Sequence, residues 1–131
     1  MMRIIVFSSS RTIRKRFAAV ERARSIDVSF EDPAHIRKIV KEQDKETIVY
    51  IDVGGVEKNL KKLVRELSNM DHVRIGVLDL KNDVDDPAEL FFAGAFDYIG
   101  KPVLSEEVPA KRLKKATEYR PHSGSDTSRS E

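Results

Sequence analysis

The stretch Thr47-Ile48-Val49-Tyr50-Ile51-Asp52-Val53-Gly54-Gly55 decides how this 131-residue chain can fold. Its first five residues form an uncharged run that is typical of a β-strand buried on both faces, and such strands belong to parallel sheets. A carboxylate, Asp52, follows at the end of that strand, and the Gly-Gly pair then ends the regular structure. We therefore expect a central parallel strand with an aspartate at its carboxyl end.

Outward from this strand, two more apolar runs predict buried strands: residues 2–7, and residues 73–78, which end at Asp79. Residues 26–30 alternate apolar and polar side chains, as an edge strand does, and residues 96–99 form a short last strand. Between the strands, apolar residues recur at spacings of three and four, which predicts amphipathic helices. These helices cover residues 11–23, a segment that starts at Asp32-Pro33, residues 60–67, residues 86–92 and residues 105–119.

Strands and helices that alternate with short connections predict an α/β fold, a five-stranded parallel sheet with helices on both faces. The apolar strands belong in the centre and the alternating strand at an edge, which gives the flavodoxin-like order 2-1-3-4-5. In that order the functional crevice lies at the carboxyl ends of strands one and three. Residues 1–120 are predicted to form this domain. Residues 121–131 contain four serines and no bulky apolar side chain, which predicts a disordered tail.

The composition excludes several classes of function. With 40% hydrophobic residues the chain can build a core, and the absence of cysteine excludes a disulfide framework, a thiolate zinc site and a cysteine nucleophile. Three scattered histidines argue against a histidine-based metal or hydrolase site. No apolar run approaches a membrane span or a signal peptide, and a net charge of +2 does not favour nucleic-acid binding. We expect a cytoplasmic protein that binds neither membrane nor nucleic acid.

Charged residues are unevenly distributed along the chain. Residues 1–24 hold seven basic side chains against one acidic, whereas residues 79–97 hold six acidic side chains against one basic. Such runs are often no more than solvated helix faces. The alternative is a pair of surface patches that select a partner of opposite charge.

A second stretch carries a specific resemblance. The segment Phe92-Ala93-Gly94-Ala95-Phe96-Asp97-Tyr98-Ile99-Gly100-Lys101-Pro102 closely resembles the end of response-regulator receiver domains of the chemotaxis type, in which a Gly-Ala pair leads into an Asp-Tyr strand and a Lys-Pro dipeptide. The predicted order of elements, the aspartate after the third strand and the length agree with this family over residues 2–119. The resemblance implies a two-component signalling protein with a flavodoxin-like fold.

The family pattern implies roles for four residues. Asp52 matches the aspartate that accepts a phosphoryl group, and Lys101 matches the lysine that pairs with that group. The Lys101–Pro102 peptide bond is expected to be cis, as is typical of the family. Tyr98 matches an aromatic side chain that switches between buried and exposed rotamers, and an ordinary edge-strand aromatic is the alternative.

Two departures from the family pattern decide our functional interpretation. Where the family has an acidic pair that holds Mg²⁺, this chain has Ser8 and Ser9, which are poor ligands for that ion. Where the family has a Thr or Ser that meets the phosphoryl oxygens, this chain has Asp79, whose negative charge repels them. The resemblance therefore indicates a degenerate receiver, or pseudo-receiver, that retains Asp52 as a carboxylate paired with Lys101.

We accordingly expect a binding module that works without phosphorylation or a cofactor and is not an enzyme, because no nucleophile–base pair is apparent. The main alternative is a receiver that accepts a phosphoryl group on Asp52 with the help of Mg²⁺. Another is a divalent ion held jointly by Asp52 and Asp79. A third is an anion or small-molecule binder through the loop Ser8-Ser9-Ser10-Arg11-Thr12, although a simpler role for that loop is that Ser9 or Ser10 caps the first helix.

The expected partners are signalling proteins, and a homodimer is a second expectation. Receivers commonly make contacts around the fourth helix, fifth strand and fifth helix, and there this chain has aromatic side chains beside opposite charges, which suit a twofold contact. An acidic residue on the edge strand can instead serve only to prevent open strand pairing. The predicted interface residues are Phe91, Phe92, Asp97, Lys111, Arg112 and Lys115.

Overall fold

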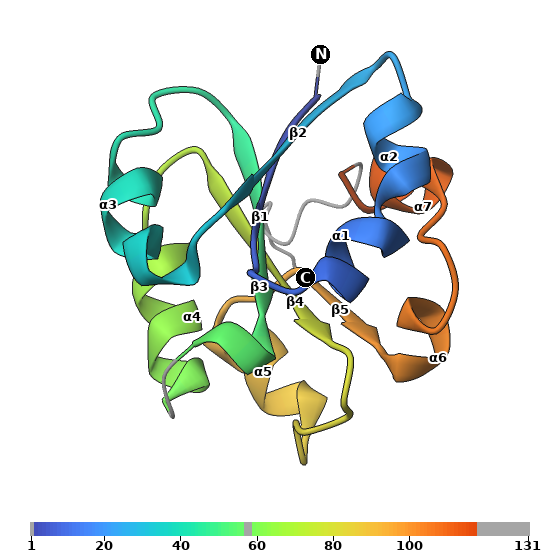
Figure 1. Ribbon diagram of the computed structural model, residues 1–131. Coiled ribbons are helices and arrows are strands. Elements are labelled where there is room, and N and C mark those ends of the chain that lie inside the picture. Colours follow the sequence, from blue (N-terminus) through green and yellow to red (C-terminus); the bar gives the residue numbers. More distant parts are fainter. Residues whose placement is uncertain (1, 57–58, 118–131) are drawn as a thin grey trace, which may run out of the picture.

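The computed structural model describes residues 2–56 and 59–117. The strands are β1 (Met2–Phe7), β2 (Ile26–Glu31), β3 (Thr47–Asp52), β4 (Val73–Asp79) and β5 (Asp97–Gly100). They form one parallel sheet in the order β2-β1-β3-β4-β5, which confirms the predicted order (Figure 1). The apolar β3 lies at the centre, where all of its residues are buried, and β2 lies at one edge.

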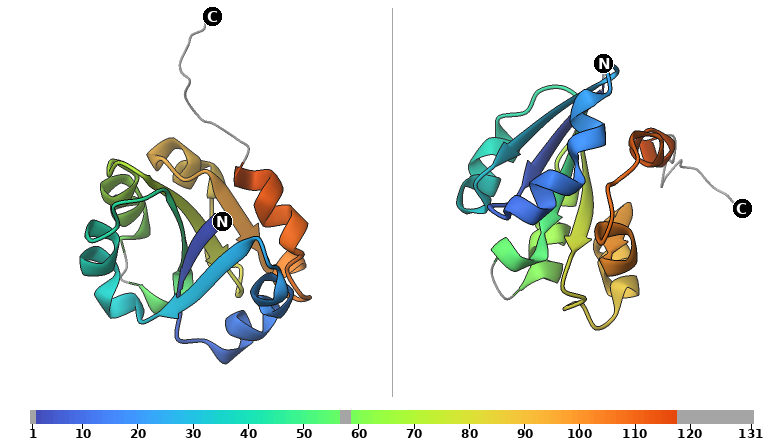
Figure 2. Two further views of the ribbon diagram at one scale, coloured as in Figure 1. Left: turned by 90° about the horizontal axis from the view of Figure 1, so that it is seen from above. Right: turned by 45° about the vertical axis from the view of Figure 1, so that its right-hand side comes forward.

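Helices cover both faces of this sheet. The α-helices are α1 (Arg11–Arg16), α2 (Ala18–Arg22), α3 (Ile36–Lys41), α4 (Leu60–Ser68), α5 (Pro87–Ala93), α6 (Lys101–Leu104) and α7 (Ala110–Thr117), and the 3₁₀ turns are η1 (Pro33–His35) and η2 (Val53–Gly55). Helices α3, α4 and α5 pack on one face, and α1, α2, α6 and α7 pack on the other (Figure 1, Figure 2). The two helix layers are why the central strands are apolar on both sides.

Each face of the sheet has its own hydrophobic core, because successive side chains of a strand point to opposite faces. In β1, Ile5 and Phe7 belong to the cluster under α3, α4 and α5. Ile4 and Val6 belong to the cluster under α1, α2, α6 and α7. The last side chains of the central strands are therefore held rigidly, and the loops that follow them start from fixed positions.

Two helices that the sequence predicts as continuous are broken in the structure. Residues 11–23 form α1 and α2, separated at Phe17, whose buried ring packs edge-on against Phe30 and Tyr50. The final helix, predicted from residue 105 with its regular part from near Val108 because of Pro109, begins at Ala110. The residues directly before it are not helical, and the buried Val108 donates its N–H to the carbonyl of Arg16 at 2.6 Å. In both places, burial of one apolar residue overrides the local helical pattern.

Within the described parts of the chain, no helix combines the length and the apolar character needed to cross a membrane. The segment predicted to be a disordered tail, residues 121–131, lies outside the described residues. The predicted helix starts after Asp32 and Asp86 are present: each carboxylate accepts the backbone N–H of the residue two positions on, at 2.9 and 3.1 Å.

Candidate functional site

The carboxyl ends of β1, β3 and β4 bring four of the predicted site residues to one edge of the sheet. Asp52 ends β3, Asp79 ends β4, and the segment after β1 begins with Ser8 and Ser9. A cavity of about 180 Å³ opens between them. Its lining consists of Ser9, Ser10, Asp52, Gly54, Gly55, Asp79, Leu80, Lys81 and Asp83. The basic side chain of this lining is Lys81, which no sequence pattern indicated as a site residue.

Asp52 is buried, and its two oxygens have partners within the same edge. One oxygen accepts the hydroxyl of Ser8 at 2.6 Å, and the other accepts the backbone N–H of Gly54 at 3.1 Å. The Ser8 hydroxyl in turn accepts the N–H of Ser10 at 3.0 Å. Ser8, at a position where the family has an acidic residue, is thus a hydrogen-bond partner of Asp52. The two residues are 44 positions apart, so no local sequence pattern predicts this contact.

The serine loop after β1 is used to start a helix. The side chain of Ser10 accepts the N–H of Ile13 at 3.3 Å and so caps α1, which agrees with the simpler of the two roles that the sequence suggested. The hydroxyls of Ser8 and Ser10 are therefore engaged with the protein itself. Ser9 lines the cavity.

Asp79 is almost completely buried, with 1% of its surface exposed, and it organises the loop that follows β4. One carboxylate oxygen accepts the N–H of Asp83 at 2.8 Å; the other accepts the N–H of Val84 at 2.9 Å and the hydroxyl of Tyr98 at 2.6 Å. We call this arrangement the Asp79 clasp. Both oxygens of Asp79 therefore accept hydrogen bonds from the protein itself. The described residues contain no group of three or more potential metal ligands, and an ion held by Asp52 and Asp79 alone stays an alternative.

The side chain of Tyr98 is half-buried, and its hydroxyl points to the buried carboxylate of Asp79. It pairs with Val77 in the sheet, so Asp79, two residues further along β4, lies diagonally within its reach on the same face. Burial, then the hydrogen bond to Asp79 and the charge of that carboxylate, raise the pKa of Tyr98 above its ordinary value. The contact between Tyr98 and Asp79 follows from the pairing register of β4 and β5, and the sequence alone does not give that register.

Two predictions about Lys101 and Pro102 are wrong. Lys101 is exposed and has no ion-pair partner among the residues that the structure describes, so it does not pair with Asp52. The Lys101–Pro102 bond is trans. Both differences have one cause: Lys101 and Pro102 form the first turn of α6, whose helical path continues through a hydrogen bond from Ser105 N–H to the Lys101 carbonyl at 2.8 Å.

The predicted interface charges Asp97 and Arg112 bind each other within the chain. One oxygen of Asp97 accepts the hydroxyl of Tyr50 at 2.7 Å, and the other accepts a guanidinium N–H of Arg112 at 3.1 Å. The Asp97 side chain is only 12% exposed, which corrects its prediction as a free charge on the edge strand. Burial, then the charge of Asp97, raise the pKa of Tyr50 well above its ordinary value.

The other predicted interface residues differ in how far the structure describes them. Phe91 is 46% exposed and Phe92 is 88% exposed, both on α5. Lys111 is exposed on α7. The side chain of Lys115 lies outside the described part of the chain. The exposed aromatic side chains Phe91 and Phe92 are therefore accessible to a partner, whereas Asp97 already binds Arg112 and Tyr50 within the chain.

Comparisons with known proteins agree with this architecture. No protein-family model matches the chain, and no curated protein matches it. Among solved structures it is similar to the receiver domain of the TMAO respiratory system response regulator TorR, with a TM-score of 0.70 and 22% identity over 90% of this chain and 98% of that one. It is also similar to the response regulator RcsB of Salmonella typhimurium, with a TM-score of 0.61 and 12% identity over 92% of this chain and 71% of that one. This chain therefore has the fold of response-regulator receiver domains.

Proposed function

We propose that this protein is a cytoplasmic, receiver-like module that binds signalling proteins without being phosphorylated and without catalysing a reaction. The observation that carries the proposal is the Asp79 clasp. A buried carboxylate stands where receivers place a Thr or Ser, and its two oxygens already accept hydrogen bonds from three donors of the chain.

The charges around Asp52 oppose phosphoryl transfer. That reaction depends on positioning and on neutralising negative charge. Here Asp52, Asp79 and Asp83 line one small cavity with a single cation, Lys81, while Lys101 turns away into solvent. An incoming phosphoryl group would meet two further carboxylates within the site, without an acidic pair to hold Mg²⁺.

The clasp also fixes the side chain that receivers are expected to use as a switch. In the family resemblance, the aromatic residue on the last strand moves between buried and exposed rotamers. Here the Tyr98 hydroxyl donates to the carboxylate of Asp79 at 2.6 Å, an acceptor that the chain itself supplies. Because hydrogen bonds to charged groups are stronger than neutral ones, the inward rotamer is favoured without any phosphoryl group.

Phosphorylation is tested directly by intact-mass spectrometry after incubation with acetyl phosphate and Mg²⁺. We expect no phosphoryl adduct on the wild-type chain, and the same result for Asp52→Asn. A triple variant that restores the family pattern, Ser8→Asp, Ser9→Asp and Asp79→Thr, is expected to take up more phosphoryl group than the wild type. A stoichiometric adduct on the wild type that disappears in Asp52→Asn would establish the alternative, a phospho-accepting receiver.

The proposal places partner contacts at the exposed aromatic side chains of α5, including self-association. Light scattering over a concentration series compares the wild type with Phe92→Ser, because Phe92 is the more exposed of the two aromatics. A dimer that weakens in Phe92→Ser supports a homodimer on this face. A wild type that is monomeric at every concentration leaves the face to other proteins and rejects self-association.

A further inference from the structure

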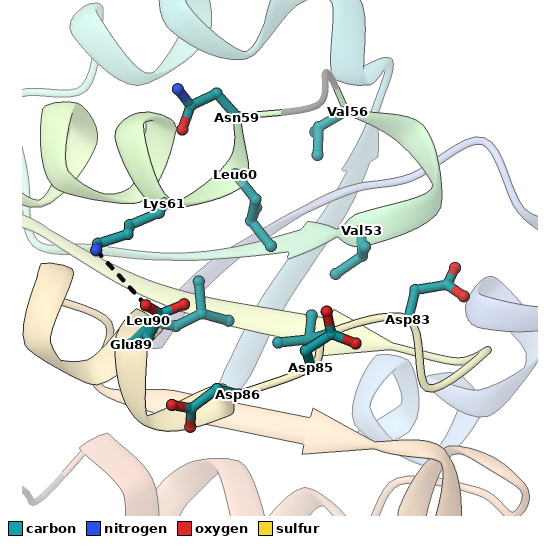
Figure 3. Close-up of a pocket in the computed structure, with 11 residues that line it drawn as sticks. Val53, Val56, Asn59, Leu60, Lys61, Asp83, Asp85, Asp86, Glu89 and Leu90 are labelled. Carbon is teal, nitrogen blue, oxygen red and sulfur yellow. Dashed lines mark ion pairs between the residues drawn. The ribbon is translucent and has the colours of Figure 1, made fainter.

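A groove runs between the start of α4 and the loop that joins β4 to α5 (Figure 3). Its volume is about 390 Å³. The apolar part of its lining comes from four half-buried side chains and one buried one, all packed against the core under α3, α4 and α5. These are Val53, Val56, Leu60, Val84 and Leu90. The groove is thus an accessible extension of a hydrophobic core, large enough for one or two apolar side chains.

The rim of this groove is acidic. Asp83, Asp85, Asp86 and Glu89 line the side of the groove that the β4–α5 loop and α5 form, and all four are exposed (Figure 3). Among the described residues of the lining, the basic side chain is Lys61, whose amino group lies 3.8 Å from the Glu89 carboxylate. The carboxylates of Asp83 and Asp85 have no hydrogen-bond or ion-pair partner among residues 2–56 and 59–117.

The acidic wall is held in place from inside the protein. Asp79 accepts the backbone N–H groups of Asp83 and Val84, so the clasp fixes the loop that carries most of the rim. A binding surface that is already ordered loses less conformational entropy when a partner binds. The carboxylate that opposes phosphorylation therefore also builds one side of the groove.

We propose that this groove binds a short segment of a partner protein whose apolar side chains are flanked by lysine or arginine. The proposal deepens the function proposed above and rests on it, because it adds a second contact surface beside the exposed aromatic side chains of α5 and names the chemistry of the segment that binds there. The apolar floor supplies affinity through burial, and the acidic rim selects basic flanks and repels acidic ones. The same rim excludes nucleic-acid phosphates.

A second copy of this chain is poorly suited to bind in the groove. Its basic segment, residues 11–24, keeps Ile13, Phe17 and Val20 fully buried, so it offers no apolar anchor. Its most exposed apolar side chain, Phe92, lies on the same helix as Glu89 and would bring a second acidic rim toward the first. Neither of these parts of the described chain complements the groove, so the occupant that we propose is a segment of a different protein.

The test is an NMR titration of the isotope-labelled full chain with three short synthetic peptides. The first has two leucines one helical turn apart, flanked by arginines; the second replaces the arginines with glutamates; the third replaces the leucines with alanines. We expect the first to shift the amide signals of Val53, Leu60 and Val84, and to bind at least about tenfold more tightly than either of the others. No phosphodonor is present, so the outcome is independent of the phosphorylation test.

Charge-reversal variants locate the binding. Asp83→Lys with Asp85→Lys is expected to weaken binding of the first peptide roughly threefold to tenfold, since each rim charge contributes modestly. The matched control, Asp71→Lys with Glu42→Lys, changes the net charge equally at exposed positions outside the groove and is expected to leave affinity unchanged. The proposal is rejected if no peptide shifts the groove signals, if the alanine peptide binds equally well, or if both pairs of substitutions weaken binding alike.

Discussion

Two tyrosine–aspartate pairs lie on opposite faces of the sheet, and they differ in what else holds the carboxylate. Tyr50 donates to Asp97 within the core under α1, α2, α6 and α7, and Arg112 supplies a positive charge to the same carboxylate. Tyr98 donates to Asp79 beside the other core, and there the remaining donors are two backbone N–H groups. The first carboxylate has a guanidinium among its partners, whereas the hydrogen-bond donors of the second are all uncharged.

The difference separates an anchor of the fold from an anchor of the site. Arg112 belongs to α7, so the Asp97 pair ties the last helix to the starting end of β5. The Asp79 pair instead ties down the loop at the carboxyl edge, where the cavity and the groove lie. The Asp79 pair therefore orders the loop beside the cavity and the groove, whereas the Asp97 pair holds one helix against the sheet.

The comparison is tested most severely by Asp97→Ala. This change leaves Arg112 without its carboxylate and the buried Tyr50 hydroxyl without an acceptor, so we expect the free energy of unfolding to fall by about 2–3 kcal/mol. The loss stays below that of a fully buried ion pair, because Arg112 is 37% exposed. Urea unfolding measures it, with Asp27→Ala as the control, since the Asp27–Arg3 pair is exposed. If Asp97→Ala lowers the free energy of unfolding no more than Asp27→Ala does, the Asp97 pair is not an anchor of the fold.

The second prediction concerns the loop anchor. Asp79→Ala is expected to lower the free energy of unfolding by about 2 kcal/mol, because two backbone N–H groups and one hydroxyl lose their acceptor. The amide protons of Asp83 and Val84 should exchange faster than in the wild type, as hydrogen-exchange NMR can measure. Asp85→Ala, which removes a neighbouring exposed charge, serves as the control. Unchanged exchange at Asp83 and Val84 would show that the loop does not depend on the clasp.

Both pairs predict a loss of stability in alkaline solution. The folded-state pKa values of Tyr50 and Tyr98 are raised, so each tyrosine's contribution is complete below its unfolded pKa of about 10 and is lost as the pH rises from there through the folded value. We expect the free energy of unfolding to fall as the pH rises above about 10, with a larger contribution from the buried Tyr50 than from the half-buried Tyr98, where solvent screens the interaction. Urea unfolding at stepped pH, with Tyr50→Phe and Tyr98→Phe, tests this. Slopes identical to the wild type's in both variants would contradict the prediction.

Tyr98→Phe removes a single hydroxyl from the clasp. We expect it to cost about 0.5–1 kcal/mol, because Asp79 keeps its two backbone donors and the half-buried position admits water. A double-mutant cycle with Asp79→Asn measures how much of this cost belongs to the pair itself. Additive costs would mean that Tyr98 and Asp79 are neighbours without being coupled.

The smallest effect on stability is expected for Phe92→Ser. The side chain of Phe92 is 88% exposed, so its removal should change the free energy of unfolding by less than about 0.5 kcal/mol. Thermal unfolding checks this, and Leu90→Ser on the buried side of the same helix is the comparison. A large loss in Phe92→Ser would mean that this aromatic supports the fold and is not available to a partner.

Local patterns in the sequence were enough to predict the strands, their order and the edge at which the site lies. Apolar runs and the alternation of β2 carry that information directly, and Asp52 and Asp79 follow from being the last residues of their strands. The partners of those carboxylates could not be predicted. The pairings of Ser8 with Asp52 and of Tyr98 with Asp79 depend on how distant strand ends meet, and the outward turn of Lys101 depends on α6 starting one residue after β5.

The interruptions of the predicted helices also depend on contacts between distant segments. The burial of Phe17 and Val108 is a property of the assembled core, and it interrupts helices that the spacing of apolar residues alone predicts as continuous. Sequence reasoning from one chain describes segments, whereas these positions are decided by contacts between segments.

The nature of Asp79 has a consequence for how the protein can be controlled. A phosphoryl group is attached and removed on demand, but a carboxylate encoded in the gene is present from synthesis to degradation. Under the function proposed above, a module held by such a group has no off state that phosphorylation controls. The occupancy of its surface then follows mass action, so it is set by how much of this protein and of its partner the cell makes. Synthesis and turnover, rather than a kinase, would carry the signal.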